Sequence, residues 1–121
     1  MGEAERVARS YWAAEAARDL VRVMEHYNDD ATFSAPGYDL HGKVEILRFY
    51  QESAARFPGL SVEVGHVTGG GSNAAIEWRA TFTTPTGRQV PLHGVNVIET
   101  ANGRFQHVRV YYDPQELDRE S

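Results

Sequence analysis

The sequence predicts a single α+β domain, residues 1–121, in which three N-terminal helices cap a cone-shaped, curved antiparallel sheet and enclose a pocket. Two observations lead to this class. Apolar residues recur at steps of three and four in the first half of the chain, as in helices, and with a period of two after residue 59, as in strands. Helices first and strands last favour helices gathered on one face of a sheet. A chain of 121 residues suits one core.

The first helical region covers residues 3–27. Asp19 interrupts it, and its short carboxylate is a good N-cap because it accepts hydrogen bonds from the free backbone N–H groups at a helix start. We therefore expect two helices with a tight joint at Asp19. The apolar face that runs along both consists of Val7, Tyr11, Ala14, Leu20, Met24 and Tyr27.

A short strand and a third helix follow. Residues 31–34 are β-prone and stop at Ala35-Pro36-Gly37, where proline and glycine mark a turn. Residues 37–42 are expected to form a loop. The third helix is expected at about residues 43–57, because apolar residues share one side of it and Pro58-Gly59 ends it.

Four strands are expected at about residues 60–68, 74–83, 89–99 and 105–112. Glycine, proline and asparagine separate them, at residues 69–71, 85–87 and 102–103. Consecutive hairpins make the sheet antiparallel.

Composition excludes several classes of function. The net charge is −5 and Lys and Arg form no basic stripe, so a nucleic acid is not expected as a partner. No stretch approaches the roughly 20 apolar residues that span a bilayer, so no membrane is expected either. The absence of cysteine excludes disulfides, and the acidic N-terminus lacks the apolar core of a signal peptide. We therefore expect a soluble protein in a reducing cytoplasm.

Alternation along the strands indicates which side chains face the helices. Ile76, Trp78, Ala80 and Phe82 alternate with polar residues, so they are expected inward and Trp78 is placed in or beside the pocket. In the next strand Leu92, Gly94, Asn96 and Ile98 share one face, and His93, Val95 and Val97 share the other.

The outer face of the predicted sheet is partly apolar. It carries Val95, Val97 and Tyr111, and a second copy of the same face is the simplest cover for them. The sequence thus predicts a homodimer. The alternative, a protein partner on this face, predicts a monomer.

The element order, together with Arg18-Asp19-Leu20, the run from Tyr27 to Phe33 and Phe49-Tyr50, resembles the nuclear transport factor 2-like superfamily, in particular its SnoaL-like and ketosteroid isomerase-like members. The resemblance covers almost the whole chain. The superfamily holds isomerases, cyclases, epoxide hydrolases, dehydratases and noncatalytic binding proteins, so it supports the fold more than a particular function.

The resemblance to ketosteroid isomerases assigns roles residue by residue. It puts Tyr11 at the position of a tyrosine that donates to a substrate oxyanion, with Tyr50 and Tyr27 as tyrosines that form a relay to it. It puts Asn96 where those enzymes have an acid, and Asn96 still donates a hydrogen bond. It puts Ala35 where they have the proton-carrying aspartate, and a methyl group accepts no proton.

A second resemblance, to limonene epoxide hydrolases, lies in Val108-Arg109-Val110-Tyr111-Tyr112-Asp113. It puts Val110 at the position of one of their acids. This departure speaks against their water-activating chemistry.

Other residues complete the candidate site. Either His41 or Asp39, expected near the pocket mouth, can replace the missing base, or both are simply solvated. The aromatic residues Phe33, Phe49, Trp78 and Tyr112, with Val110, are candidates for a ligand-binding wall or for ordinary core. Alternation puts His93 on the outer face unless a bulge reverses its strand. Histidines and acids lack metal-ligand spacing, so neither a metal nor a cofactor is expected.

Two functional hypotheses follow from these residues. The first is a small-molecule enzyme, isomerase- or cyclase-like, that acts by acid/base chemistry on a hydrophobic carbonyl-containing or polycyclic substrate. The second is a noncatalytic module of the same fold that binds a small ligand or dimerises. The absence of an acid at both matched carboxylate positions keeps the second open.

Overall fold

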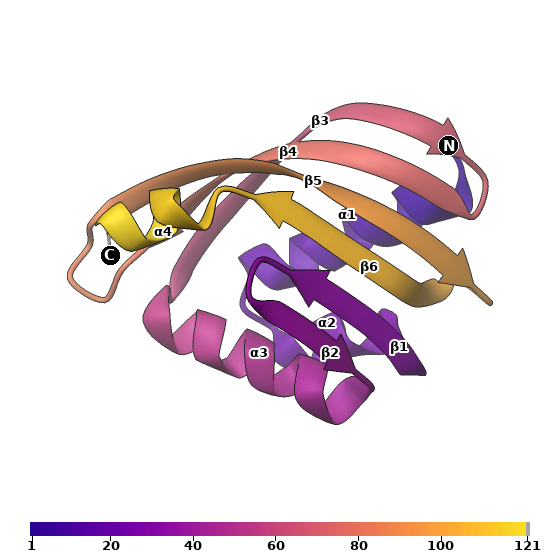
Figure 1. Ribbon diagram of the computed structural model, residues 1–121, viewed down its shortest axis with the longest axis horizontal. Helices are drawn as coiled ribbons and strands as arrows, with labels where there is room; N and C mark the ends of the chain where they lie inside the picture. The colour runs from indigo at the N-terminus through magenta and orange to yellow at the C-terminus, as the bar shows by residue number, and fades with distance from the viewer. Residues whose placement is uncertain (121) are drawn as a thin grey trace.

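The computed structural model describes residues 1–120, with side chains described for residues 1–117. Its helices are α1 (Glu3–Ala16), α2 (Leu20–Glu25), α3 (Lys43–Arg56) and α4 (Pro114–Glu120). Its strands are β1 (Tyr27–Ala35), β2 (Tyr38–His41), β3 (Gly59–Gly70), β4 (Asn73–Thr83), β5 (Gln89–Ala101) and β6 (Arg104–Tyr112). The α+β class is confirmed, and so is the predicted order of two helices, a short strand, a third helix and four strands, to which the structure adds β2 and α4 (Figure 1).

The described strands form one sheet in the order β2-β1-β6-β5-β4-β3. The last four are joined by consecutive hairpins and pair antiparallel, as the turn spacing predicts. The pairing of β1 with β6 is parallel, which the sequence did not indicate, because no hairpin links these two strands. With β2 and β3 at its edges, the sheet stays open.

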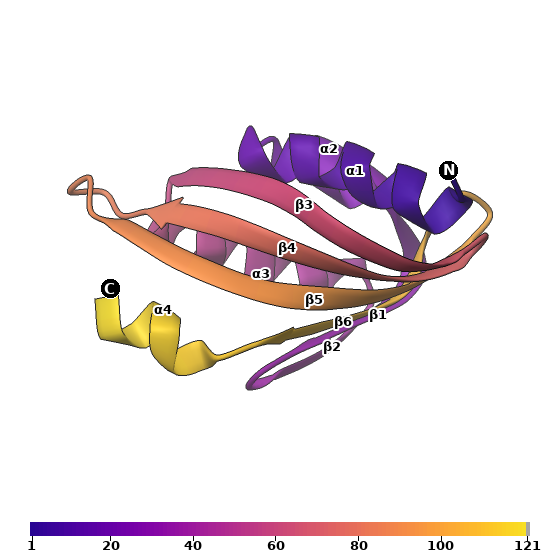
Figure 2. The same ribbon diagram turned by 90° about the horizontal axis from the view of Figure 1, so that it is seen from above.

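The helices lie mainly on one face of this curved sheet (Figure 2). α1 packs on β3, β4 and β5, while α3 packs on β1 and β2. α4 lies beside β5, on the other side of the strands from α1 in Figure 2. None of the helices within residues 1–120 has the length and apolar character needed to cross a bilayer.

The joint between α1 and α2 confirms the predicted N-cap. The Asp19 carboxylate accepts a hydrogen bond from the Arg22 backbone N–H at 3.3 Å. Immediately before it, Arg18 has a left-handed backbone with φ of 54°, a conformation that costs a non-glycine residue about 1 kcal/mol. Glycine is the usual residue at this position after a helix. An arginine here therefore points to a use for its side chain.

One loop prediction is wrong. Residues 38–41 form β2, which pairs with β1 in the register Ala35↔Tyr38, instead of a loop. Pro36 and Gly37 make the two-residue turn between them, and Gly37 has φ of 84°, as a type II turn requires after proline. The turn was recognised in the sequence, but four residues with two polar side chains carry too little alternation to indicate a strand.

α4 was not predicted. Asp113 caps it, since its Oδ1 accepts from the Gln115 N–H at 3.0 Å, and Pro114 stands at the first helical position, where it needs no N–H partner. The pair Asp113-Pro114 is the signal that would have revealed this helix. Leu117 packs against the core from α4.

The inward face of the sheet is confirmed. Ile76, Trp78 and Ala80 are buried on β4, and Leu92 and Asn96 are buried on β5. Gly94 lies directly opposite Trp78 in the register. A Cβ at Gly94 would lie 2.6 Å from Cζ2 of Trp78 and would also strike the Tyr111 carbonyl oxygen. Glycine at this position therefore leaves the space that the Trp78 ring occupies beside β5.

Candidate functional site

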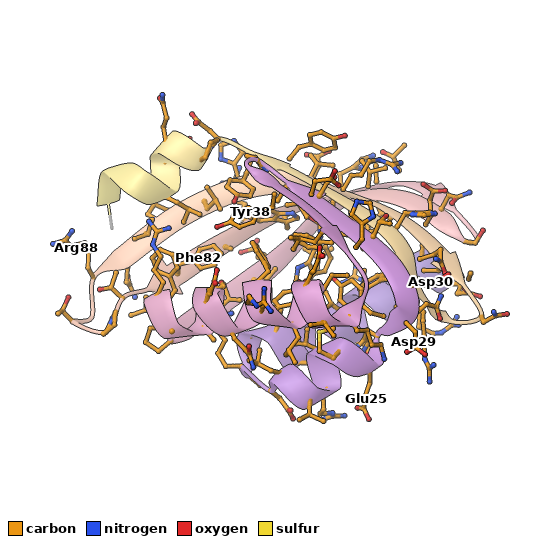
Figure 3. All side chains as sticks on the ribbon, turned by 60° about the horizontal axis from the view of Figure 1, so that its bottom comes forward. Glu25, Asp29, Asp30, Tyr38, Phe82 and Arg88 are labelled. Carbon is orange, nitrogen blue, oxygen red and sulfur yellow. The ribbon has the colours of Figure 1, made fainter. Side chains whose placement is uncertain are left out.

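A cavity of about 380 Å³ lies between α1, α3 and the inner face of the sheet. Its walls are mostly apolar, and the turn at Pro36 and the start of α4 contribute to its rim. Tyr38 and Phe82 line it and are labelled in Figure 3, where Asp29 and Asp30 lie toward the opposite end of β1 from Tyr38. A volume of this size suits a small organic ligand.

The residues expected to form a ligand-binding wall line this cavity. They are Phe33, Phe49, Trp78, Val110 and Tyr112. Phe33 and Phe49 pack against each other with ring centroids 4.9 Å apart. The wall joins β1, α3 and the inner face of two further strands, β4 and β6, so a flat ligand would meet aromatic surface from several elements.

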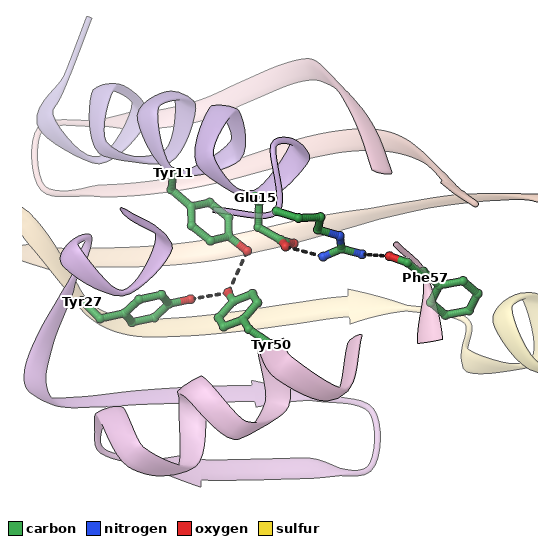
Figure 4. A network of polar contacts seen from close by, with 6 residues as sticks. Tyr11, Glu15, Tyr27, Tyr50 and Phe57 are labelled. Atoms are coloured by element: carbon green, nitrogen blue, oxygen red, sulfur yellow. Dashed lines mark hydrogen bonds and ion pairs between the residues drawn. The ribbon is translucent and has the colours of Figure 1, made fainter. Parts of the chain in front are cut away.

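Three buried tyrosine hydroxyls form a continuous chain (Figure 4). The Tyr50 hydroxyl lies 2.7 Å from that of Tyr11 and 2.6 Å from that of Tyr27. Tyr11 comes from α1 and Tyr50 from α3, whereas Tyr27 begins β1 instead of ending a helix as expected. Tyr11 and Tyr50 line the cavity, so the chain runs from the core to the ligand space.

Burial keeps these phenols neutral. Desolvation raises the pKa of Tyr11, Tyr27 and Tyr50 above their ordinary value of 10.0, and the nearby Glu15 carboxylate raises each of them further. Each phenol then has one hydrogen to donate. The cluster is a set of hydrogen-bond donors at neutral pH and does not supply a phenolate base.

Asn96 is buried on β5 and lines the cavity. Its Oδ1 accepts a hydrogen bond from the Trp78 indole N–H at 2.8 Å. Because an indole N–H only donates, this contact fixes which end of the amide faces Trp78. The Nδ2 group is the end left for other partners.

Sequence reasoning missed a buried ion pair beside the tyrosines. Glu15 is 8% exposed and lines the cavity, and its Oε1 accepts from Nη1 of Arg18 at 2.6 Å. Arg18 also donates from Nη2 to the Phe57 carbonyl oxygen at 2.6 Å, which ties the α1–α2 joint to the end of α3 (Figure 4). The left-handed backbone of Arg18 thus accompanies a side chain that bridges Glu15 and Phe57.

The pKa of Glu15 reflects competing contacts. Desolvation by burial raises the pKa, while the charge of Arg18 and hydrogen bonds from Arg18 and Tyr11 lower it, and the net shift is upward. The sequence feature that could have revealed Glu15 is its spacing from Tyr11. Glu15 follows Tyr11 by four residues on one helix, so both side chains share a face.

The two bases proposed from the sequence lie apart from this cluster. Asp39 and His41 are on β2 with side chains 81% and 67% exposed, and they contact each other at 3.4 Å. Neither is among the residues that line the cavity. Ala35, at the position matched to a base, does line it. His93 is on the outer face, 76% exposed and 4.0 Å from Glu116 of α4.

A larger hollow of about 980 Å³ lies on the outer face of the sheet, between β3, β4, β5 and α4. Glu63, Arg79 and His93, among its polar residues, are exposed. It contains none of the buried hydroxyl or carboxyl groups described above. The inner cavity is therefore the better candidate for chemistry.

An open, curved sheet with helices on one face and a pocket between them defines the class of nuclear transport factor 2-like proteins. Within this class the chain belongs to the SnoaL-like domain family, whose profile matches residues 8–108. No curated protein gives a significant match to the chain.

Solved structures share this fold at low sequence identity. A nuclear transport factor 2-like protein of unknown function from Burkholderia pseudomallei aligns with a TM-score of 0.87 at 20% identity over 99% of this chain and 98% of its own. An epoxide hydrolase of the limonene type from M. tuberculosis aligns with a TM-score of 0.81 at 19% identity over 98% and 88%. TerC, crystallised with polyporic acid, aligns with a TM-score of 0.83 at 14% identity over 95% of both chains. These likenesses establish the fold.

Proposed function

We propose that this protein is an enzyme that acts by cofactor-free acid/base chemistry on a small hydrophobic substrate with a carbonyl group or a polycyclic ring system, in the manner of an isomerase or cyclase. The observation that carries the proposal is the hydroxyl chain from Tyr27 through Tyr50 to Tyr11, which is buried and ends in an apolar cavity. Polar groups of this kind in a largely apolar cavity are typical of a binding or active site.

Tyr11 is the donor for the substrate oxygen in this proposal. Tyr50 donates to Tyr11 and thereby strengthens its O–H as a donor, and Tyr27 supports Tyr50 in the same way. A preorganised donor in a dry site contributes about 3 to 4 kcal/mol when negative charge develops on the oxygen. Asn96 offers its Nδ2 as a second donor on the opposite wall, held by Trp78.

Two of the similar solved structures support a small organic molecule as the ligand, although they do not identify it. An epoxide hydrolase and a protein co-crystallised with polyporic acid have the same fold, and each is described together with a small organic molecule or with action on one. The aromatic wall around Phe33, Phe49 and Trp78 suits such a molecule.

Replacement of Tyr11 by phenylalanine tests the proposal. With a β,γ-unsaturated polycyclic ketone as substrate, we expect Tyr11→Phe to lower kcat by about 10² to 10³ because one oxyanion donor is lost. Tyr111→Phe is the matched control, since Tyr111 is exposed on the outer face. Unchanged turnover in both Tyr11→Phe and Asn96→Ala would contradict the site.

The second candidate is a noncatalytic binding module. Ala35 at the matched base position favours it, because the route through an aspartate at that position is closed. It predicts that an apolar dye binds the cavity in a one-to-one ratio while the β,γ-unsaturated polycyclic ketone is not converted.

The outer sheet face supports a further part of the proposal, a twofold dimer. Val95 is flanked by Glu77 and Tyr111 in the register, and Val97 is flanked by Arg109. Acidic and basic residues around an apolar centre are self-complementary, since a twofold axis brings one sign against the other. A second copy of this chain is therefore the proposed occupant.

Sedimentation equilibrium tests the dimer. We expect twice the chain mass of 13.5 kDa for the wild type and a shift to the monomer for Val97→Lys, which puts a new charge at the centre of the face. Val44→Lys, an exposed residue on α3, is the control that stays dimeric. A wild-type mass near 13.5 kDa would rule the dimer out.

A further inference from the structure

We propose that Glu15 is the group that moves the proton in this cavity, and that Arg18 is its positioning residue. The inference rests on the proposed function, because it names the base that the matched position, Ala35, cannot supply. It stands on three observations: a buried carboxylate in the cavity wall, a guanidinium that fixes it, and a phenol, Tyr11, one helical turn away on the same face of α1.

Among the side chains described, those of residues 1–117, the cavity wall contains two carboxylates, Glu15 and Glu52. Glu52 is exposed at the rim, whereas Glu15 is 8% exposed and projects from α1 beside Tyr11. Tyr11 and Glu15 lie one helical turn apart, and Figure 4 shows both side chains directed to the same space above Tyr50. A substrate oxygen bound to Tyr11 is therefore close to Glu15 as well.

Arg18 holds the carboxylate in place without covering it. Its Nη1 donates to Oε1 of Glu15 at 2.6 Å, and its Nη2 is held by the Phe57 carbonyl oxygen at 2.6 Å. With Oε1 engaged, Oε2 is the oxygen available to a substrate or to Tyr11. A guanidinium anchored at two points fixes the orientation of the carboxylate, as a general base requires.

The hydroxyl chain has a direction that ends at Glu15. An ionised carboxylate only accepts, so the Tyr11 hydrogen points to Glu15 as long as Glu15 is ionised. Tyr50 then donates to Tyr11, and Tyr27 donates to Tyr50. The donor for the substrate oxygen and the base are thus linked through a single hydrogen atom.

This link couples the two halves of an isomerisation. Ionised Glu15 takes a proton from the carbon beside the substrate carbonyl, the C–H bond breaks, and its electron pair moves onto the carbonyl oxygen as an enolate. Protonated Glu15 no longer competes for the Tyr11 hydrogen, which turns to the enolate oxygen. The carboxylic acid then returns the proton to the far carbon of the conjugated system, so no co-reactant is consumed.

Other titratable or charged groups face Glu15 from the elements around it. They are Arg18 at the end of α1, Tyr11 on α1, Tyr27 on β1 and Tyr50 on α3, with Glu52 and Arg56 of α3 at the rim. Arg18 is the cation paired with Glu15. Burial raises the pKa of Glu15 toward the range where a carboxylate is an effective base for a weakly acidic C–H.

Binding of para-nitrophenolate tests the proposal without any turnover, because its oxygen anion stands in for the enolate. The anion avoids an ionised carboxylate, so we expect the wild type to take up about one proton on binding at pH 8. Its affinity is expected to fall about tenfold per pH unit above the pKa of Glu15. Calorimetry in two buffers of different ionisation enthalpy measures this uptake.

Glu15→Gln mimics the protonated acid and keeps the shape. We expect it to bind the phenolate with no proton uptake and with a pH-independent affinity in the same range. Glu15→Asp keeps the carboxylate and is expected to keep the uptake. Glu5→Gln is the matched control, since Glu5 lies on the same helix outside the cavity lining and also pairs with an arginine, Arg9, at 2.9 Å.

Arg18→Lys tests the positioning role. The lysine ammonium lacks the planar, two-pronged guanidinium, so it holds the Glu15 carboxylate less well and lowers its pKa less. The pH above which phenolate affinity falls is therefore expected to move upward. A merely structural Arg18 would alter stability and leave this pH unchanged. With a converted ketone, Glu15→Gln is also expected to lower kcat by about 10² to 10⁴.

The outcomes separate the two proposals. Equal proton uptake in wild type and Glu15→Gln overturns the role of Glu15 while the Tyr11 site stands. Failure of the wild type to bind the phenolate at all overturns the oxyanion site, and the proposed function and the role of Glu15 fall together. Circular dichroism and urea midpoints of each variant confirm that it is folded.

Discussion

Raising the pH above 10 is expected to unfold this protein over a narrow range. The three buried phenols have pKa values above the ordinary 10.0, chiefly because burial disfavours the phenolate. Unfolding exposes them, and each then ionises at its ordinary pKa. The stability they contribute is fully present below pH 10 and is lost as the pH rises toward the folded values. Three such groups lower the free energy of unfolding by about 4 kcal/mol per pH unit.

Urea titrations between about pH 9 and 11 measure this slope, with phenolate absorbance recorded on the same samples. Tyr27→Phe and Tyr50→Phe are each expected to reduce the slope by about a third, since one ionising group is removed. Tyr111→Phe leaves it unchanged, because Tyr111 is exposed in the folded state. Gradual ionisation of all tyrosines ahead of unfolding would show that the cluster is open to solvent.

The resemblance predicted the tyrosine cluster, and two of its three members occupy patterned positions, whereas Tyr27 was expected at a helix end and begins β1. Tyr11 lies on the apolar face of a helix, and Tyr50 on that of another. Side chains on the inner faces of packed elements converge, and the resemblance to ketosteroid isomerases named Tyr50 and Tyr27 as partners of Tyr11. The sequence could not show which of the three hydroxyls lies between the other two. The distances place Tyr50 in the middle of the chain.

Glu15 and Arg18 escaped prediction for a physical reason. A charged residue on a helix is normally solvated, and nothing local indicates that Phe57, thirty-nine positions after Arg18, supplies a carbonyl to the guanidinium. The contact also depends on the left-handed Arg18 backbone, which helix propensities do not anticipate. A charged side chain that is buried by tertiary contacts is thus harder to predict from the sequence than the apolar face of a helix or strand.

The opposite error affected Asp39 and His41. Their residue types suit proton transfer, and they lie close to a predicted turn, but residue type alone does not determine exposure. Once residues 38–41 pair as an edge strand, these side chains stand in solvent. Any general base must reach the bound substrate, which makes burial in the cavity wall the better criterion.

Removal of the Arg18 charge is expected to cause the largest loss of stability of any single replacement at this site. Arg18→Met leaves the Glu15 carboxylate buried without its cation and removes the bond to the Phe57 carbonyl, and breaking a buried pair costs about 3 to 5 kcal/mol. Urea unfolding at pH 8 measures this loss. Arg9→Met removes the exposed partner of Glu5 and is expected to cost below about 1 kcal/mol.

The loss is expected to depend on pH in a defined direction. Arg18 lowers the pKa of Glu15, so without it the folded pKa rises further above the ordinary 4.5. A raised carboxyl pKa leaves stability intact below the unfolded value, and that stability is lost as the pH rises through the folded value. Arg18→Met is therefore least destabilised near pH 4 and most at pH 8. An equal loss at both would place the effect on the Phe57 bond, and Glu15→Leu combined with Arg18→Met, which removes both charges, is expected to restore much of the stability at pH 8.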